Sequence, residues 1–158
     1  MRDKLVVWLL VGAPGSGKTT FGKTLVEGDP RIVRFCPDEF RAIFGNGEGD
    51  QSVSAKAFEA TRVALDQALS EHKSVVIDAT NMYRKARKQF LDIADKHNAM
   101  KSAMVFEVDK STLIDRNVKR GANGGRNVPE NVIDTMLGRY ERPATPEFDS
   151  VTFVSKMS

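Results

Sequence analysis

The sequence has 158 residues, of which 41% are apolar and 28% charged, with a net charge of +3 and one cysteine. This balance is typical of a globular chain and excludes wholesale disorder, and the length favours a single domain over residues 1–158. One cysteine, Cys36, excludes an internal disulfide, which favours a reducing, cytoplasmic setting; we interpret it as a buried small residue. The apolar run at 5–11 is too short to span a bilayer, so no membrane segment is expected.

Segments of strand and helix character alternate along the chain. Residues 4–11 form a continuous apolar run, as in a strand buried on both faces, and a helix is expected from about residue 17 to 27. Further strands are expected at 31–35, 74–78, 101–108 and 151–155, and further helices at 37–44, 54–71, 84–97, 111–120 and 129–142. Strands that alternate with helices predict an α/β fold, in which a parallel sheet is covered on both faces.

The first strand leads into the sequence GAPGSGKTT, where Gly12, Gly17, Lys18 and Thr19 fit the pattern G-x-x-x-x-G-K-[ST]. Glycines let such a loop curl so that backbone N–H groups point at phosphate, and the helix N-terminus adds positive charge. Lys18 is expected to reach the β- and γ-phosphates, and Thr19 to bind Mg²⁺. The residues expected to bind ATP, or another nucleoside triphosphate, are Gly12, Ala13, Pro14, Gly15, Ser16, Gly17, Lys18, Thr19 and Thr20.

A second nucleotide motif is indicated by VVIDATN, which ends a buried strand with Asp78. In such motifs the carboxylate reaches Mg²⁺ directly or through water, although a strand-end turn explains Asp78 equally well. Thr80 and Asn81 follow it. A guanine-specific GTPase usually carries an N-K-x-D loop, which this sequence lacks, and large motor ATPases need a longer chain. A small phosphotransferase therefore fits better.

The sequence CPDEFR follows the second expected strand, at the sheet edge where ligands of open α/β folds bind. Asp38 and Arg41 are three residues apart and share a helix face. A carboxylate there could take the proton of an attacking hydroxyl, and an arginine could grip an acceptor phosphate. On spacing alone a simple N-cap is the favoured role for Asp38, and the two roles are compatible.

Two basic stretches carry further hypotheses. Arg116 and Arg120 lie one helical turn apart in STLIDRNVKRG, before the sequence GANGGRN, and could form a lid over ATP phosphates; a solvated basic face is an equal alternative. The run YRKARK, residues 83–88, could follow a nucleic-acid backbone, but we favour a solvated helix start.

Together the motifs resemble the polynucleotide kinase family, in particular the kinase domain of its bacteriophage member, a 5′-hydroxyl kinase of nucleic-acid repair. The resemblance covers nearly the whole chain and rests on GAPGSGKTT, PDEFR, DATN, and RNVKRG followed by NVPENVI. It implies an adenylate-kinase-like P-loop NTPase fold in three layers. The five parallel strands would have the order 2-3-1-4-5, and a helical lid would cover about residues 111–128.

The resemblance also implies roles for individual residues. Asp38 would be the general base, Arg41 would bind the phosphate next to the acceptor hydroxyl, and Arg120, helped by Arg116, would meet the donor phosphates. On the acceptor side, the residues expected to contact substrate are Asp38, Arg41, Thr80, Asn81, Val128 and Val132. Thr19 and Asp78 would hold Mg²⁺.

The predicted function is thus transfer of the γ-phosphoryl group of ATP, with Mg²⁺, to a 5′-hydroxyl end of DNA or RNA. Alternatives are a kinase acting on a hydroxymethylated base in DNA, such as 5-hydroxymethyluracil, or on a small-molecule hydroxyl. A third alternative is a nucleotide-dependent regulatory module. Asp38 and Arg41 argue against the module, since a pure switch needs neither a base nor an acceptor clamp.

Overall fold

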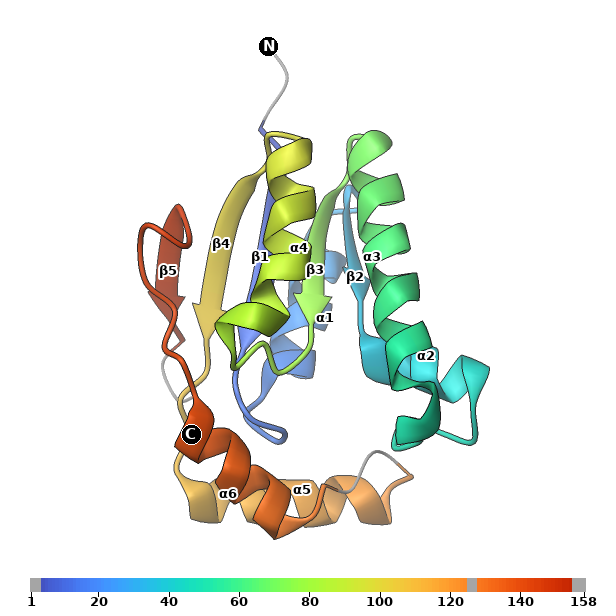
Figure 1. Ribbon diagram of the computed structural model, residues 1–158, viewed down its shortest axis with the longest axis vertical. Helices are drawn as coiled ribbons and strands as arrows, with labels where there is room; N and C mark the ends of the chain where they lie inside the picture. The colour runs from blue at the N-terminus through green and yellow to red at the C-terminus, as the bar shows by residue number, and fades with distance from the viewer. Residues whose placement is uncertain (1–3, 125–127, 155–158) are drawn as a thin grey trace.

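A parallel sheet forms the centre of the computed structural model, which describes residues 4–124 and 128–154. Its strands are β1 (Val6–Val11), β2 (Ile32–Phe35), β3 (Ser74–Asp78), β4 (Met100–Val105) and β5 (Ser150–Phe153). They are hydrogen-bonded in the order β2-β3-β1-β4-β5, and every pairing is parallel (Figure 1). The predicted strand order, 2-3-1-4-5, is therefore confirmed.

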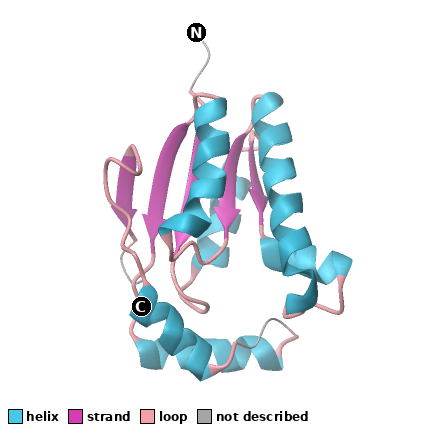
Figure 2. Cartoon of the chain, viewed as in Figure 1, coloured by secondary structure: helices cyan, strands magenta, loops and turns pink. Residues whose placement is uncertain are grey.

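Helices cover both faces of this sheet and one of its ends. They are α1 (Lys18–Gly28), α2 (Pro37–Phe44), α3 (Ser54–Ser70), α4 (Arg84–Lys96), α5 (Lys110–Ala122) and α6 (Glu130–Arg139), with a short 3₁₀ turn at Gln51–Val53. Helix α1 packs on one face, and α3 and α4 pack on the other (Figures 1 and 2). Helices α5 and α6 lie across the end of the sheet to which all the strands point.

The central strand β1 is apolar throughout because both of its faces are buried. Successive side chains of a strand point to opposite faces. Val7 and Leu9 pack in the cluster that also contains residues of α3 and α4, whereas Leu10 packs with Phe21 and Leu25 of α1. Two apolar layers thus clamp β1 and fix where its carboxyl end delivers the glycine-rich loop.

The start of α2 differs from the prediction. Cys36 occupies the N-cap position and Pro37 the first turn, so Asp38 is not the N-cap. Proline is favoured at the first helical position because its missing N–H has no partner there in any case. The capping role predicted for Asp38 is wrong, and its carboxylate is directed to Arg41 instead.

Two elements are shorter than the sequence pattern predicts. Helix α6 stops at Arg139 because Tyr140 takes an extended backbone conformation, with φ −58° and ψ 126°. Strand β4 stops at Val105, and the next residues lead to Asp109, whose side chain caps α5. Residues 125–127 of the GANGGRN loop and of the expected lid, and residue 155 of the last expected strand, lie outside the described residues. In the described ranges no helix has the length and apolar character needed to cross a membrane.

Candidate active site

The loop between β1 and α1 has a backbone shape that requires glycine. Gly15 and Gly17 have φ values of 85° and 99°, in the left-handed region. A Cβ at Gly12 would lie 2.7 Å from the Ser16 hydroxyl and 2.8 Å from the Phe106 carbonyl oxygen. A Cβ at Gly15 would lie 3.0 Å from a carbonyl oxygen of α5. Side chains at these positions would therefore force the loop away from its neighbours.

Lys18, the first residue of α1, is buried inside this loop. Its Nζ lies 3.0 Å from the Ala13 carbonyl oxygen and 3.4 Å from the Ser16 hydroxyl. Burial lowers the pKa of Lys18 to about 8, although the nearby carboxylates of Asp78 and Asp38 partly oppose this effect. Both hydrogen-bond partners of Nζ are uncharged, so a bound anion would stabilise this desolvated ammonium, as expected for a phosphate-binding lysine.

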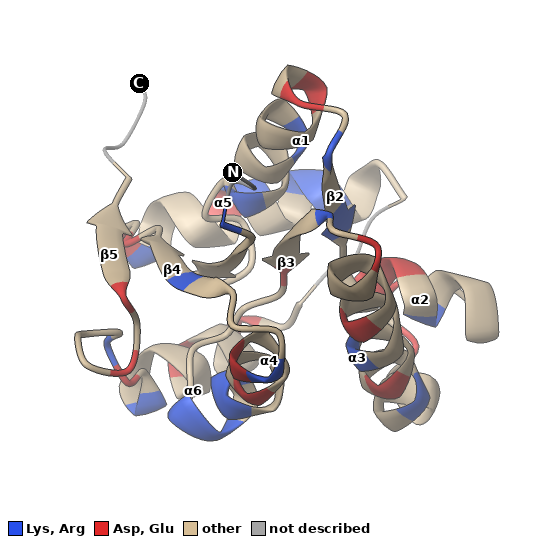
Figure 3. Ribbon diagram, turned by 90° about the horizontal axis from the view of Figure 1, so that it is seen from above, with Lys and Arg blue, Asp and Glu red and all other residues tan. Residues whose placement is uncertain are grey.

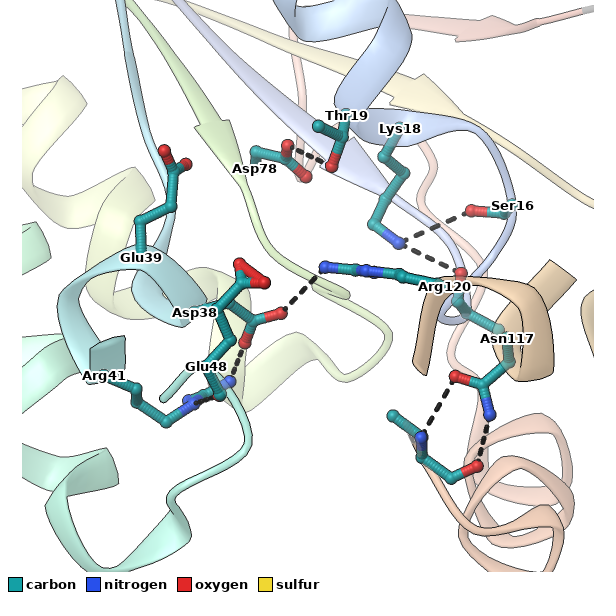
Figure 4. Close-up of polar contacts among 12 residues, drawn as sticks. Ser16, Lys18, Thr19, Asp38, Glu39, Arg41, Glu48, Asp78, Asn117 and Arg120 are labelled. Carbon is teal, nitrogen blue, oxygen red and sulfur yellow. Dashed lines mark hydrogen bonds and ion pairs between the residues drawn. The ribbon is translucent and has the colours of Figure 1, made fainter. Parts of the chain in front are cut away.

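Thr19 and Asp78, both expected at a Mg²⁺ site, lie in contact. The Thr19 hydroxyl donates to Oδ2 of Asp78 at 2.9 Å (Figure 4). The same oxygen accepts two hydrogen bonds from Arg34, at 3.0 and 2.7 Å. Burial alone would lower the pKa of Arg34, but the charge and hydrogen bonds of Asp78 raise it, so the guanidinium is charged.

The donor set fits Mg²⁺. A hydroxyl and a carboxylate are hard oxygen ligands, and Mg²⁺ is usually held by one or two such groups together with phosphate oxygens and water. Over residues 4–124 and 128–154 no cluster of three or more histidine, cysteine or acidic residues could hold a metal by itself. Thr19 and Asp78 would therefore hold the ion together with a bound nucleotide.

Asp38 of α2 lies opposite the loop and is contacted from two elements. Arg41, one turn further along α2, forms an ion pair with Oδ1. Arg120 of α5 places its Nη2 at 3.5 Å from Oδ2 (Figure 4). Asp38 also raises the pKa of Lys18, so the carboxylate and the loop lysine share one electrostatic environment.

The guanidinium of Arg41 is held on several sides. It is 4% exposed, and it donates to the Glu48 carbonyl oxygen at 3.0 Å and to the Ser54 hydroxyl at 3.2 Å, besides its pair with Asp38. These contacts tie α2 to the connector and to the start of α3. Arg41 therefore orients Asp38 whatever else it binds.

The two arginines of α5 reach different parts of the site. Arg116 donates to the Gly15 carbonyl oxygen at 3.2 Å, whereas Arg120 reaches Asp38. Between them on α5, the buried Asn117 holds the backbone of Val128 through both its N–H, at 3.0 Å, and its carbonyl oxygen. The spacing of Arg116 and Arg120 thus lets α5 bridge the loop and α2.

A cavity of about 850 Å³ lies beside the glycine loop and extends to α2 and α5. It is lined by residues of the glycine loop and α1, by Arg34, Cys36 and Glu39, by Phe106 to Val108, and by Arg116 and Arg120. Cys36 is buried as predicted, and desolvation, followed by the charges of Asp78 and Asp38, raises the pKa of its thiol to about 12. The raised pKa therefore favours the neutral thiol.

None of the predicted acceptor residues, Asp38 and Arg41 included, is among the residues that line this cavity. Val128 is buried in an apolar cluster with Ala13, and Val132 packs against the same cluster. The Thr80 carbonyl oxygen accepts the N–H of Gly12, and the buried Asn81 side chain donates to Leu10 at 2.9 Å. Thr80 and Asn81 thus brace the glycine loop, and their contact with substrate stays a prediction.

Three polar residues of this region were not singled out from the sequence. Arg34 binds Asp78, Asn117 holds Val128, and Arg87, fully buried in the run assigned to a solvated helix start, binds Glu147 and two carbonyl oxygens. Arg34 could have been found as a charged residue in a strand that both neighbouring layers cover, since such a charge needs a partner. Arg87 carried no comparable signal.

The glycine loop, the buried lysine and the strand order define a P-loop protein. The chain belongs to the AAA_33 family, described as AAA domain, which matches residues 7–143.

Among curated proteins, an Arabidopsis thaliana protein named transcription factor bHLH140 is 34% identical over 96% of this chain and 16% of its own length. The L-seryl-tRNA(Sec) kinase of Methanococcus maripaludis is 25% identical over 87% of this chain and 53% of its own length. Among solved structures, a chain of the Pnkp1/Rnl/Hen1 RNA repair complex has a TM-score of 0.76 and 26% identity, and the match covers 88% of this chain and 45% of that one. The chain therefore spans about half, or less, of these proteins.

Proposed function

We propose that the chain is an ATP-dependent kinase that transfers the γ-phosphoryl group to a 5′-hydroxyl end of a nucleic acid. The observation that carries the proposal is the placement of Asp38, a carboxylate that is held by Arg41 and Arg120 and lies close enough to Lys18 to raise its pKa. A nucleotide switch has no use for a carboxylate held at this place. A kinase needs one to receive the proton of the attacking hydroxyl.

Each group then has a task in phosphoryl transfer, which depends mainly on positioning and charge stabilisation. The glycine loop and Lys18 bind the β- and γ-phosphates. Thr19 and Asp78 hold Mg²⁺, which supplies charge neutralisation of the phosphates when bound. Asp38 accepts the proton from the attacking hydroxyl. Arg120, which reaches this carboxylate from the lid, stabilises charge that develops on the transferred group.

The choice of a nucleic-acid acceptor rests on similarity and on Arg41. Two of the similar proteins carry names that refer to RNA, an RNA repair complex and a seryl-tRNA kinase. A terminal nucleotide carries a 3′-phosphate a few bonds from its 5′-hydroxyl. An arginine one turn from the base binds it through two hydrogen bonds when it exchanges its contacts with Glu48 and Ser54 for the phosphate.

An acceptor panel tests the proposal. The chain is incubated with γ-labelled ATP and 5′-hydroxyl RNA, 5′-hydroxyl DNA, a hydroxymethylated duplex, or a set of sugars. We expect label on a 5′-hydroxyl end, and loss of labelling in Asp38→Asn but not in Asp115→Asn, a matched change at an exposed lid position. Labelling confined to the duplex base or to a sugar would assign that hydroxyl, rather than a 5′-hydroxyl end, as the acceptor. No labelling of any acceptor would contradict the assignment as a kinase.

A further inference from the structure

Arg34 places a positive charge beside the expected metal site, and the sequence motifs of this site give it no role. Only 10% of its side chain is exposed. It donates twice to Oδ2 of Asp78, and its Nη1 lies 2.5 Å from the Glu39 carboxylate. It also lines the cavity that contains Lys18. Because a guanidinium stays protonated in proteins, Arg34 keeps a positive charge at this site.

Helix α1 accommodates this side chain through Gly22. A Cβ at Gly22 would lie 3.3 Å from Cδ of Arg34, tighter than ordinary contact, so any larger residue would press on the arginine stem. Glycine is unfavourable inside a helix. The glycine thus stands where the stem of Arg34 passes α1 on its way to Asp78.

Arg34 and Thr19 bind the same oxygen of Asp78, whose side chain is 3% exposed. Every hydrogen bond that Asp78 makes within the described ranges ends on Oδ2, from Thr19 and Arg34. A divalent ion held by Thr19 and Asp78 would therefore share this carboxylate with a guanidinium.

We propose that Arg34 is a built-in cation that makes nucleotide binding less dependent on the divalent metal. Its charge attracts the phosphates when the metal is absent and competes with the metal for Asp78 when the metal is present. The proposal rests on the proposed function, which places a nucleotide and Mg²⁺ in this cavity. Arg34 acts here as a positioning and charge-balancing residue rather than as a catalytic one.

The test measures ADP affinity by calorimetry with Mg²⁺ and again with a chelator. The quantity compared is the dissociation constant in chelator divided by the dissociation constant in Mg²⁺. Arg34→Met should increase this ratio about tenfold or more, since removing a nearby charge weakens metal-free binding and strengthens metal binding. Arg31→Met removes an arginine that is 72% exposed, just before β2, and should leave the ratio unchanged. Arg34→Lys keeps the charge and should stay within about threefold of wild type.

Arg34→Gln, which is neutral but keeps a donor for Asp78, repeats the test if Arg34→Met does not fold. An unchanged ratio in the neutral variants would overturn the proposal, and so would a parallel loss of both affinities, which indicates a structural role. A Lys variant that matches the Met variant would assign the effect to hydrogen bonds and overturn the charge account. If wild type bound no ADP under either condition, the proposed function would fail as well. Normal ADP binding by wild type, with an unchanged ratio in the neutral variants, would contradict only the role of Arg34.

Discussion

Arg120 of α5, which lines the cavity, approaches Asp38 of α2, with 3.5 Å between Nη2 and Oδ2. They are 82 residues apart in sequence, yet this contact joins the lid to the expected acceptor side of the site. Lys and Arg residues occur on most of the helices around the sheet (Figure 3). The pair of Arg120 and Asp38 differs from most of the other charged residues because Arg120 lines the cavity. Its importance can be tested through Asp38.

Asp38→Asn keeps the size of the side chain but cannot accept a proton. We expect phosphoryl transfer to fall by about 10²–10⁴-fold, the range for loss of a general base, while ADP affinity stays within a few-fold of wild type. Single-turnover kinetics and calorimetry separate the two quantities. Normal transfer in this variant would restrict Asp38 to its structural contact with Arg41.

Lys18→Ala removes the ammonium from the glycine loop. Transfer should fall by about two or more orders of magnitude, the scale for loss of a preorganised charge partner. Lys96→Ala, at a position that is 65% exposed on α4 and outside the cavity lining, serves as the matched control and should be near wild type. Turnover in Lys18→Ala similar to that of the control would exclude the P-loop assignment of this lysine.

The lowered pKa of Lys18, about 8, predicts a pH dependence. Between about pH 8 and the ordinary value of 10.5, the lysine is largely neutral in the folded chain and protonated in the unfolded chain. The unfolded state then binds more protons, so the contribution of Lys18 to the free energy of unfolding rises with pH across this window. Nucleotide affinity should change oppositely and fall above about pH 8. Urea titrations and calorimetry, with Lys18→Met as reference, measure both; identical pH profiles for the two proteins would contradict the shift.

Arg41 tests the identity of the acceptor. Wild type should use a nucleoside 3′-monophosphate better than the bare nucleoside by about 1.5–3 kcal/mol, the range for hydrogen bonds to charged groups. Arg41→Ala should abolish that preference, whereas Arg84→Ala, at a position that is 68% exposed, should keep it. Competition assays give the ratio directly. Equal use of both acceptors by wild type would mean that Arg41 only orients Asp38, and a base hydroxymethyl or small-molecule acceptor would then be favoured.

Arg87 joins α4 to the segment after α6 through Glu147 and to the loop after β3 through the Asn81 carbonyl oxygen. Because Arg87 is fully buried, Arg87→Met leaves a carboxylate and carbonyl oxygens without their donor. We expect the free energy of unfolding to decrease by about 3–5 kcal/mol, measured in urea. Lys88→Met, one residue further on and 71% exposed, should cost at most about 1 kcal/mol. Similar losses in both variants would show that the buried network contributes little.

Local patterns were sufficient for much of the fold. The alternation of apolar strands with amphipathic helices predicted the parallel α/β sheet, because buried strands and helix faces leave strong periodic signals. The resemblance supplied the strand order, and the glycine motif identified the loop, whose residues are all close in sequence. Helix ends were less accurate: Asp38 was assigned to a cap that Cys36 occupies, since the sequence allowed either start.

The sequence by itself determined the glycine loop, the strands that position it, and the candidate roles of Lys18 and Thr19, because each depends on neighbouring residues. Only the tertiary structure decided which distant polar groups meet. It paired Arg34 with Asp78, Arg120 with Asp38, and Asn117 with the backbone of Val128. The physical reason is that a buried charge or amide must find a partner, but the partner is chosen by how the elements pack and not by spacing along the chain.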